Sequence, residues 1–324
     1  MSYADKVFVS SMKDIIENGV SDENLQVRPH WKDGTPAHTL AVFGMVNRYD
    51  LACEFPIITL RRTYWKSAWD EISWIWQKKS NNIEDLNSHV WDEWADEKGS
   101  IGKAYGYQMG IKHHYKEGDM DQVDRVIWSL KNDPGSRRIM TNMYNHHDLS
   151  EMALYPCAYS MTFNIAGNRL NAILHQRSQD MLTANNWNVV QYALIVYAMA
   201  SAYGYEPGEL VHVIANAHIY DRHVDIVKEM NQTMHADDPH FYTIPDDEDL
   251  LAQLLFLYEI SGGQTSRWVD EEFRTLRMAI DVASYDANEL AANMKTIEQT
   301  CAELFPQTDC HLIGRAVQFA ELNN

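Results

Sequence analysis

Apolar residues recur at helical spacing in four stretches of the first 203 residues. In the earliest of them, Val7, Met12 and Ile15 fall on one face of a helix. The second is rich in tryptophan, the third is closed by the sequence NDPG, and the fourth is apolar on nearly every side, which is typical of a central helix. We therefore predict helices over residues 3–18, 63–77, 123–131 and 189–203.

A different period, alternating apolar and polar positions, covers residues 160–175. The alternation is interrupted by Gly167 and Asn168, a pair that favours a tight hairpin turn. Residues 210–217 are a further strand candidate. Helices and strands of this kind predict an α+β fold, with helices packed on a mixed β-sheet.

The composition changes near residues 235–245, where the chain becomes acidic and regains helical spacing. We therefore expect a catalytic domain over residues 1–235 and a divergent, mostly helical region over 236–324. The N-terminus lacks the basic and apolar segments of a signal peptide, and no apolar run is long enough to cross a bilayer. With four cysteines that match neither zinc nor disulfide spacing, the expected location is the cytoplasm.

The formal net charge of −19 disfavours binding to nucleic acid as a polymer, since such binding needs clustered cations. It leaves room for one phosphorylated metabolite, provided that a few arginines gather locally. Five short motifs between residues 136 and 223 offer such groups: SRR, YPCAY, QRSQDM, NNWN and AHIYDRH. Each alone is a weak signal, because a lone cysteine is usually a core residue and an arginine pair is usually a solvated surface. His218 and His223 lack a metal-binding spacing, so no metal is expected.

Together, in this order, these motifs resemble the thymidylate synthase family, as do FPIITLRR and VWDEWADEKGSIGKAYG upstream. The resemblance implies that Cys157 is a nucleophile toward C6 of a deoxyuridylate-like nucleotide, and that 5,10-methylenetetrahydrofolate is the co-substrate. Addition of a thiolate to C6 makes C5 nucleophilic, which divides one difficult step into easier ones. A free thiol is mostly protonated at neutral pH, so the thiolate needs a neighbouring cation, for which Arg177 is the candidate.

The same resemblance implies how the phosphate and the sugar are bound. Arginine pairs with phosphate oxygens in a bidentate manner, which lysine does not. Arg177 and Ser178 match phosphate ligands of the same subunit, whereas Arg137 and Arg138 match a pair that reaches into the partner subunit's site. A homodimer with two composite sites follows, with Arg28 as a further ligand. His218 and Tyr220 resemble the residues that bind the 3′-hydroxyl of the deoxyribose.

The family pattern also assigns roles around the base and the folate. Asn188 would read uracil, because a carboxamide donates to O4 and accepts from N3–H at once. Glu71, on the tryptophan-rich helix, resembles the general acid/base, and burial should raise its pKa. Tyr105 matches the residue linked to removal of the C5 proton. The folate-contacting set is Trp91, Trp94 and Asp180, although core packing explains the tryptophans equally well.

Several positions depart from the family pattern. Ala158, Thr183 and the pair Ala215-Asn216 replace residues that are more usual there, and the last 90 residues do not resemble a synthase. A synthase tail closes over folate and keeps water from the exocyclic methylene intermediate. Without that closure, water would add in place of hydride, so we expect a dUMP 5-hydroxymethylase. The alternatives are an ordinary thymidylate synthase, then a dCMP hydroxymethylase, and more remotely a non-catalytic paralogue that binds nucleotide or a partner protein.

Overall fold

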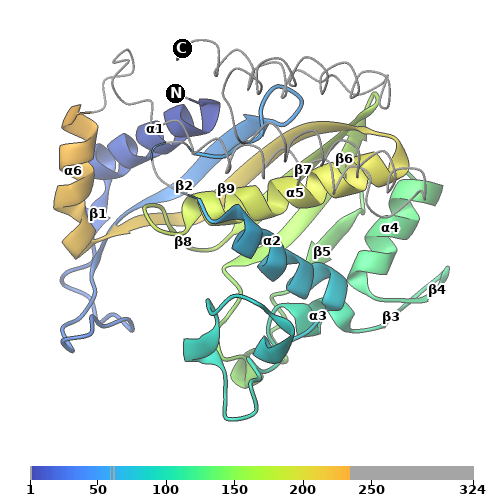
Figure 1. The fold of residues 1–324 in the computed structure, drawn as a ribbon, viewed down its shortest axis with the longest axis horizontal. Helices are drawn as coiled ribbons and strands as arrows, with labels where there is room; N and C mark the ends of the chain where they lie inside the picture. Colours follow the sequence, from blue (N-terminus) through green and yellow to red (C-terminus); the bar gives the residue numbers. More distant parts are fainter. Residues whose placement is uncertain (1, 59, 61–62, 234–324) are drawn as a thin grey trace, which may run out of the picture.

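The computed structural model describes residues 2–58, 60 and 63–233 of the chain. The predicted helical region over residues 236–324 lies outside the described residues. What is described forms one mixed sheet with helices packed on it, together with a small two-stranded sheet (Figure 1). The predicted α+β class is confirmed.

The main sheet has the strand order β1-β2-β9-β7-β6-β5, and β8 pairs with β9 outside this path. Strands β7 and β9 are parallel, as are β8 and β9, and the other neighbours are antiparallel. The strands are β1 (Val20–Ser21), β2 (Thr39–Asp50), β5 (Met140–Asn142), β6 (Ala158–Ala166), β7 (Arg169–Gln176), β8 (Gln179–Asp180) and β9 (Glu206–Tyr220); β3 (His113–Tyr115) and β4 (Gly118–Met120) form the small sheet.

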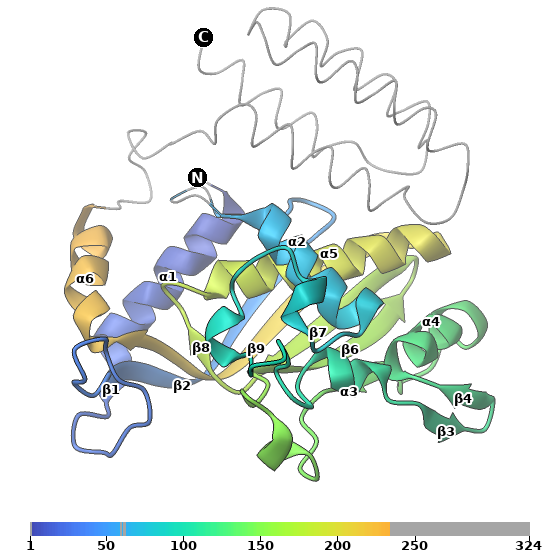
Figure 2. The same cartoon turned by 60° about the horizontal axis from the view of Figure 1, so that its bottom comes forward.

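Three helices, α1, α2 and α5, lie on one face of the main sheet (Figure 2). The first begins at a capping box in which Ser2 and Asp5 each bind the other's backbone N–H, and this satisfies two donors at the helix start. The α-helices are α1 (Tyr3–Asn18), α2 (Trp65–Ser73), α3 (Gly106–Gly110), α4 (Gln122–Asn132), α5 (Asn185–Tyr203) and α6 (Val224–Thr233).

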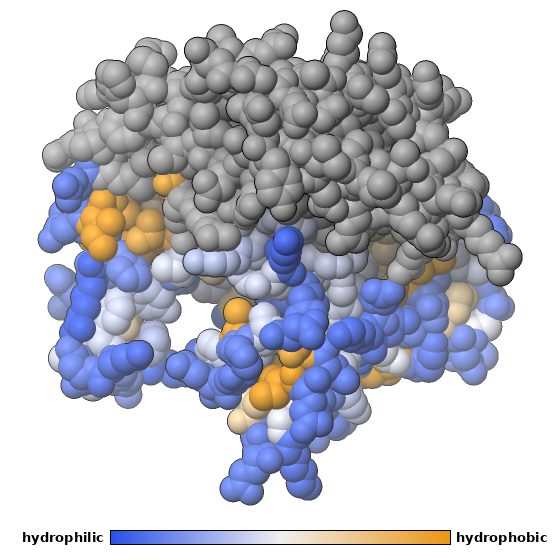
Figure 3. Space-filling view, in the orientation of Figure 1, coloured by the Kyte–Doolittle hydropathy of each residue, from blue (hydrophilic) through white to orange (hydrophobic). Residues whose placement is uncertain are grey.

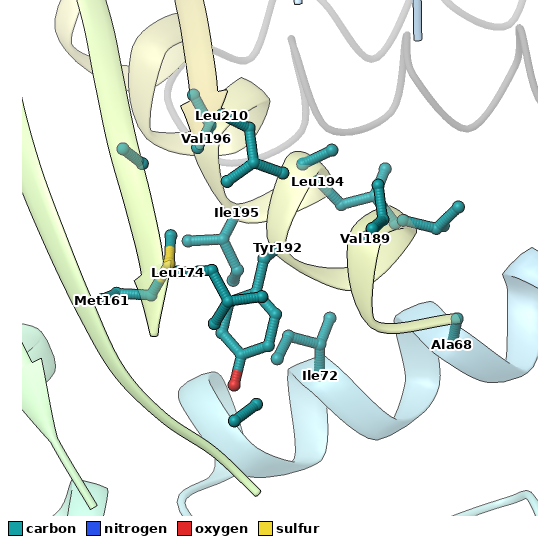
Figure 4. Close-up of a cluster of buried hydrophobic side chains, with 14 of the residues drawn as sticks. Ala68, Ile72, Met161, Leu174, Val189, Tyr192, Leu194, Ile195, Val196 and Leu210 are labelled. Atoms are coloured by element: carbon teal, nitrogen blue, oxygen red, sulfur yellow. The ribbon is translucent and has the colours of Figure 1, made fainter. Parts of the chain in front are cut away.

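Helix α5 is the centre of the core. Its side chains from Tyr192 to Val196 are buried between α2 and strands β6, β7 and β9, where they meet Ile72 and Leu174 (Figure 4). The first two turns are different, because they carry asparagines and a glutamine. One of these, Asn186, donates to Pro56 O and accepts from the hydroxyl of Thr63, and so fixes the segment that leads into α2.

The predicted hairpin is confirmed, with Gly167 at φ +64° in the turn between β6 and β7. The helix expected over 63–77 begins at Trp65 and changes at Trp74–Lys78 into a π-helical turn. This turn ends at Lys79, whose left-handed φ of +54° breaks the helix. Residues 39–50, for which no element is predicted, form β2; Gly44, at φ +84°, interrupts its extended backbone, while the pairing with β9 keeps the same register on both sides of it.

The sheet face opposite α1, α2 and α5 carries two rows of mostly apolar side chains. The register aligns Met140, Thr162, Ile173 and Val211 across β5, β6, β7 and β9, with Arg48 of β2 at the end. A parallel row contains Val46, Val213 and His175. We call these two rows the open face. Val46 and Met140 are about half exposed, and Phe43 of the same strand β2 is 91% exposed.

Candidate active site

The two predicted reactive side chains lie at the open end of the hairpin. Cys157 directly precedes β6 and Arg177 directly follows β7, and the backbone N–H of Arg177 donates to Cys157 O. The guanidinium donates through Nε to Pro156 O at 3.0 Å and through Nη2 to Tyr155 O at 2.7 Å. The same Nη2 lies 3.5 Å from Cys157 Sγ. The loop carbonyls therefore hold the cation against the thiol.

Two effects act in opposite directions on the thiol of Cys157. Burial raises its pKa and outweighs the positive charges of Arg177 and Arg28, which lower it. The net shift of the pKa is upward. The two guanidinium groups therefore reduce the energetic cost of ionising the buried thiol, but they do not make the thiolate its main form. The positive charge of Arg28, in the N-terminal loop, therefore lies close enough to act on the thiol.

Tyr105 joins the cysteine to the rest of the site. Its hydroxyl oxygen accepts the backbone N–H of Cys157 at 3.1 Å, and its ring packs edge-on against Trp91 with centroids 5.1 Å apart. The backbone of Tyr105 has φ +43°, an unfavourable region for a side chain of this size. Such strain occurs where the surrounding structure fixes a functional residue. Burial raises the pKa of the phenol well above its ordinary value, so it stays protonated at neutral pH.

Glu71 is a buried carboxyl on α2 surrounded by donors. Trp91 Nε1 donates to Glu71 Oε1 at 2.9 Å, whereas Trp187 Nε1 and Gln191 Nε2 donate to Oε2 at 2.5 and 3.0 Å. These three bonds favour the charged form, but burial is the larger effect and raises the pKa of the carboxyl. A carboxyl balanced in this way can both take up and release a proton.

Asn188, in the first turns of α5, has its carboxamide held on both sides. Its Oδ1 accepts from Gln176 Nε2 at 3.2 Å, and its Nδ2 donates to Gln191 Oε1 at 3.0 Å. Gln176 is bonded in turn to the buried His212 of β9, at 2.8 Å. Because each amide oxygen has two lone pairs and each amide nitrogen two hydrogens, Asn188 keeps one acceptor and one donor for a ligand.

The two residues predicted to bind the sugar lie at the end of β9. The rings of His218 and Tyr220 meet edge-on with centroids 5.3 Å apart, and His218 Nδ1 bonds to Asn216 Oδ1 at 2.8 Å. Burial lowers the pKa of His218 and raises that of Tyr220, and both shifts keep these side chains neutral. The carboxylate of Asp180 acts electrostatically on both residues, while its own oxygens cap the turn at Leu182 and Thr183.

The loop of residues 22–38 that carries Arg28 is fastened to the end of β9. Trp31 Nε1 donates to Asp221 Oδ1 at 3.0 Å, and the guanidinium of Arg222 lies 4.8 Å from the centre of the Trp31 ring. Arg222 also pairs with Asp33 at 2.6 Å. The surface is hollowed between this loop, at the lower left of Figure 3, and the loops at its lower centre.

The remaining predicted ligands are placed differently. Ser178 is half-buried next to Arg177, whereas Arg137 and Arg138 are exposed in the turn before β5. Within the described ranges, neither arginine of this pair makes a hydrogen bond or an ion pair. Because Met140 pairs with Thr162 in an antiparallel register, this turn lies at the other end of β6 from Cys157 of the same chain.

The tryptophans expected to contact folate form one cluster beside Tyr105. Trp91 is buried and directs its N–H at Glu71, so it serves the acid/base residue directly. Trp94 packs edge-on against Trp91 with centroids 5.5 Å apart and is 39% exposed, so part of its ring is open to a flat aromatic ligand.

Four of the residues around the site were not expected from the sequence: Gln176, Trp187, Gln191 and His212. Gln176 immediately precedes the matched Arg177, and Gln191 lies three residues after Asn188 on one helix face, which is a usable signal. No group of three potential metal ligands occurs in the described part of the chain. Among the described helices, none has the length and apolarity that a membrane crossing requires.

The chain is similar to known proteins over most of its length. The family model described as thymidylate synthase matches residues 6–254. Thymidylate synthases from Bacillus subtilis subsp. natto and from Bacillus phage phi3T are each 42% identical over 254 residues, which cover 77% of this chain and 91% of theirs. The solved structure of the thermostable thymidylate synthase A from Bacillus subtilis aligns with a TM-score of 0.68 and 41% identity, covering 72% of this chain and 85% of that one.

Proposed function

The chain belongs to the thymidylate synthase family, and from this premise we propose that it converts dUMP into dTMP with Cys157 as the nucleophile. It is a folate-dependent enzyme that modifies C5 of a pyrimidine nucleotide, with 5,10-methylenetetrahydrofolate as co-substrate. The observation that carries the proposal is the contact of 3.5 Å between Arg177 Nη2 and Cys157 Sγ, beside the hydroxyl of Tyr105.

The hydroxymethyl product that we expected from the divergent C-terminal residues finds no support. The family match continues to residue 254, beyond the boundary expected at residue 235. The relatives named above are thymidylate synthases, which favours an ordinary thymidylate synthase over a hydroxymethylase. We therefore propose methyl transfer.

In the proposed reaction, Cys157 adds as a thiolate to C6 of the uracil ring, and electron density moves through C5 to O4. Arg177 stabilises the thiolate before addition and again when the C6–S bond breaks. The bound folate supplies a methylene group to C5 and later a hydride, leaving dihydrofolate. Glu71 exchanges a proton with the O4 side of the base, which its raised pKa and its place next to the Asn188–Gln191 pair support.

Removal of the C5 proton falls to the polar region around Tyr105. The phenol stays protonated at neutral pH, so we assign it an orienting role rather than that of a full base. Its oxygen has a second lone pair beyond the Cys157 N–H bond, which suits a water molecule that receives the proton. The edge-on contact with Trp91 fixes the direction of the ring.

Substrate binding in this proposal uses three groups of residues. Asn188 reads the base, while His218 and Tyr220 bind the 3′-hydroxyl. The phosphate is bound by Arg28, Arg177 and Ser178 of the same subunit and by Arg137 and Arg138 of the partner. For folate we favour Trp94, whose exposed ring fits a flat aromatic group; Trp91 and Asp180 already direct their polar atoms to Glu71 and to the β8–α5 turn.

Enzymes of this family generally form dimers, and the open face supports one here. Its rows of Val46, Val213 and Ile173 are apolar, and an apolar sheet surface of this kind is typical of an interface between subunits. Arg138 lies two residues before Met140, which belongs to the same face. Pairing of two open faces would carry each Arg137–Arg138 pair toward the other subunit's site.

Product analysis tests the reaction. Incubation with dUMP and methylenetetrahydrofolate should give a nucleotide heavier by one methylene unit, together with dihydrofolate. A hydroxymethyl nucleotide with tetrahydrofolate would overturn the methyl transfer but keep the family chemistry. Cys157→Ser should abolish turnover, and unchanged turnover in this variant would overturn the role of the thiolate.

Complementation tests the shared site. Cys157→Ser and Arg138→Ala should each be nearly inactive alone, because one lacks the nucleophile and the other lacks the partner's cation. After unfolding and refolding as an equal mixture, about a quarter of the sites would combine an intact Cys157 with an intact partner Arg138. Recovery of roughly that share of activity is expected. No recovery would mean that Arg138 serves its own subunit.

A further inference from the structure

A chain of hydrogen bonds runs through the buried polar side chains behind the site. It begins at His212 of β9, passes through Gln176 and Asn188, and continues through Gln191 to Glu71. The first four of these side chains are partly or wholly buried, as is Glu71. Each amide can be placed in two ways, so the direction of the chain must be found from groups whose donor or acceptor character is fixed.

Backbone carbonyls fix the direction at Gln176. Its Nε2 donates to Ser178 O at 3.3 Å, and a carbonyl is only an acceptor. It also donates to Gln179 Oε1, and Gln179 is held in that orientation because its Nε2 donates to Asp180 O at 3.1 Å. The amide nitrogen of Gln176 therefore faces these two acceptors and Asn188 Oδ1, which share its two hydrogens, and its oxygen faces the imidazole of His212.

The tautomer of His212 follows from that orientation. Gln176 Oε1 lies 2.8 Å from His212 Nε2, so Nε2 must carry the hydrogen. His212 is fully buried, and burial lowers its pKa to about 3, which keeps the ring neutral and leaves Nδ1 as an acceptor. Among the described residues Nδ1 has no hydrogen-bond partner, so it is a buried acceptor left unsatisfied, and Gln176 is the partner that fixes the ring.

Indole groups fix the opposite end. Glu71 accepts from Trp91 and Trp187, whose N–H groups can only donate, and the third bond comes from Gln191 Nε2. Gln191 Oε1 then faces Asn188 and requires a donor from it. Both ends thus agree on one direction, in which every group donates toward Glu71.

The direction decides which pyrimidine Asn188 can read. Its Oδ1 has taken one hydrogen bond from Gln176 and keeps an acceptor, while its Nδ2 has given one to Gln191 and keeps a donor. Uracil offers N3–H and O4, which match these in place. Cytosine offers N3 and an amino group, and to bind it the carboxamide would have to turn over. After such a turn, the oxygen of Asn188 would face Gln191 Oε1 and its nitrogen would face Gln176 Nε2, so both hydrogen bonds would be lost.

We propose that His212 is a positioning residue that selects uracil over cytosine, by holding Gln176 and through it the orientation of the Asn188 carboxamide. The proposal rests on the function proposed above, in which Asn188 reads the base. His212 supplies the donor to Gln176 Oε1, and without it that oxygen is a buried acceptor with nothing to accept. Gln176 would then be held only through its amide nitrogen, and the unsatisfied oxygen would favour other rotamers in which the bond to Asn188 is weaker.

Binding of the two nucleotides tests the proposal. Dissociation constants for dUMP and dCMP are measured by calorimetry for the full chain and for His212→Leu, which fills similar space without a donor. The dUMP preference should fall about tenfold or more, the equivalent of one ordinary hydrogen bond. His212→Gln, which again offers an N–H, should restore most of it. An unchanged preference in His212→Leu would overturn the proposal.

A matched control separates selectivity from stability. Leu210 is buried on the same strand and takes no part in the series of hydrogen bonds. Leu210→Ala should therefore lower the melting temperature and leave the ratio of the dUMP and dCMP dissociation constants as in the unmodified protein. An equal loss of the ratio in this control would assign the effect to general loosening and overturn the specific role.

Two readouts keep the inference separate from the proposed function. In protein labelled with ¹⁵N-histidine, the nitrogen resonances of His212 should report a neutral ring with hydrogen on Nε2. Hydrogen on Nδ1 would overturn the proposed direction of the hydrogen bonds, even if no variant folds. If the unmodified protein binds no dUMP, the proposed function fails instead, and the tautomer measurement still decides the direction of the chain.

Discussion

The phenolic oxygen of Tyr105 accepts a hydrogen bond of 3.1 Å from the backbone N–H of Cys157. The bond links a residue held at φ +43° to the loop that presents the thiol. Because this N–H belongs to the reactive residue itself, any movement of Tyr105 is passed directly to the position of the sulfur. The two residues therefore act as one positioned unit.

Removal of that hydroxyl should slow the chemistry more than it weakens binding. In Tyr105→Phe the ring keeps its contact with Trp91, but the oxygen that orients the thiol loop and the proton-accepting water is lost. We expect kcat to fall about 10²-fold, the lower end of the range for a positioned proton-transfer group. Tyr205→Phe is the control, because its hydroxyl donates to Leu130 O away from the site. If Tyr105→Phe and Tyr205→Phe had equal kcat, the proposed role of the Tyr105 hydroxyl in the reaction would be wrong.

The charge of Arg28 should be measurable as thiol reactivity. Loss of a positive charge raises the pKa of Cys157 further, so Arg28→Gln should be alkylated more slowly by iodoacetamide at neutral pH. In both proteins the rate should rise about tenfold per pH unit while the thiol is mostly protonated. Mass spectrometry of the Cys157 peptide separates it from the exposed Cys53. Arg48→Gln, in a surface pair with Glu209, should leave the rate unchanged.

Glu71→Gln should cost about 10²- to 10⁴-fold in kcat, since an amide cannot carry the proton. Its effect on stability should depend on pH in a definite direction. The folded-state pKa of Glu71 is raised, so its stabilising contribution is complete below the ordinary value of 4.5 and is lost as pH rises through the folded pKa. Glutamine does not titrate. The melting temperature of the variant, relative to that of the unmodified protein, should therefore be higher at about pH 8 than at about pH 5. The same difference at both pH values would contradict the raised pKa.

The Trp31 contact should matter for phosphate binding because it fastens the loop that carries Arg28, three residues earlier in the sequence. Trp31→Phe removes the bond to Asp221 Oδ1 and keeps a ring for Arg222. We expect KM for dUMP to rise about tenfold, the value of one hydrogen bond, with kcat little changed. Trp128→Phe is the control, because the Trp128 ring on α4 also has an arginine, Arg125, at 4.8 Å. Were both variants to raise KM equally, the loop contact would not be the cause.

A charge on the open face should separate the subunits. Val46→Glu places a carboxylate in the row with Val213 and His175, where a second copy of the face would bury it without a partner. Sedimentation should show monomers, and activity should fall with the dimer. Asp50→Asn, at the exposed end of the same strand, is the control. A Val46→Glu protein that remains dimeric and active would place the interface elsewhere.

The geometry of the nucleophile was largely predictable from the chain. Alternation over residues 160–175 and the Gly167-Asn168 turn determine a hairpin, and the register of a hairpin determines that Cys157 and Arg177 meet at its open end. The setting of Glu71 was also foreseeable, since a carboxyl on a tryptophan-rich amphipathic helix has indole neighbours. In both cases the contacts are local, or follow from one pairing of adjacent strands.

What escaped prediction depends on elements that meet only in the folded chain. Gln176, Gln191 and His212 come from β7, α5 and β9, and no periodicity indicates that three polar residues will line up across them. The strand β2 escaped because its buried and exposed positions alternate only after Gly44, whose positive φ breaks the extended backbone. Trp91 was expected at the folate, and only the approach of α2 shows its N–H directed at Glu71.

Helix α5 begins with the residues proposed to read the base and continues, without interruption, as the most deeply buried of the described helices. Asn188 stands about one turn before the buried Tyr192, and Gln191 is next to it, so a change of volume in the interior shifts the carboxamide along with the helix axis. A substitution on the buried side of α5 therefore affects both the stability of the protein and its selectivity for the nucleotide. We expect the interior side of this helix to evolve more slowly than interiors of equal burial elsewhere in the protein.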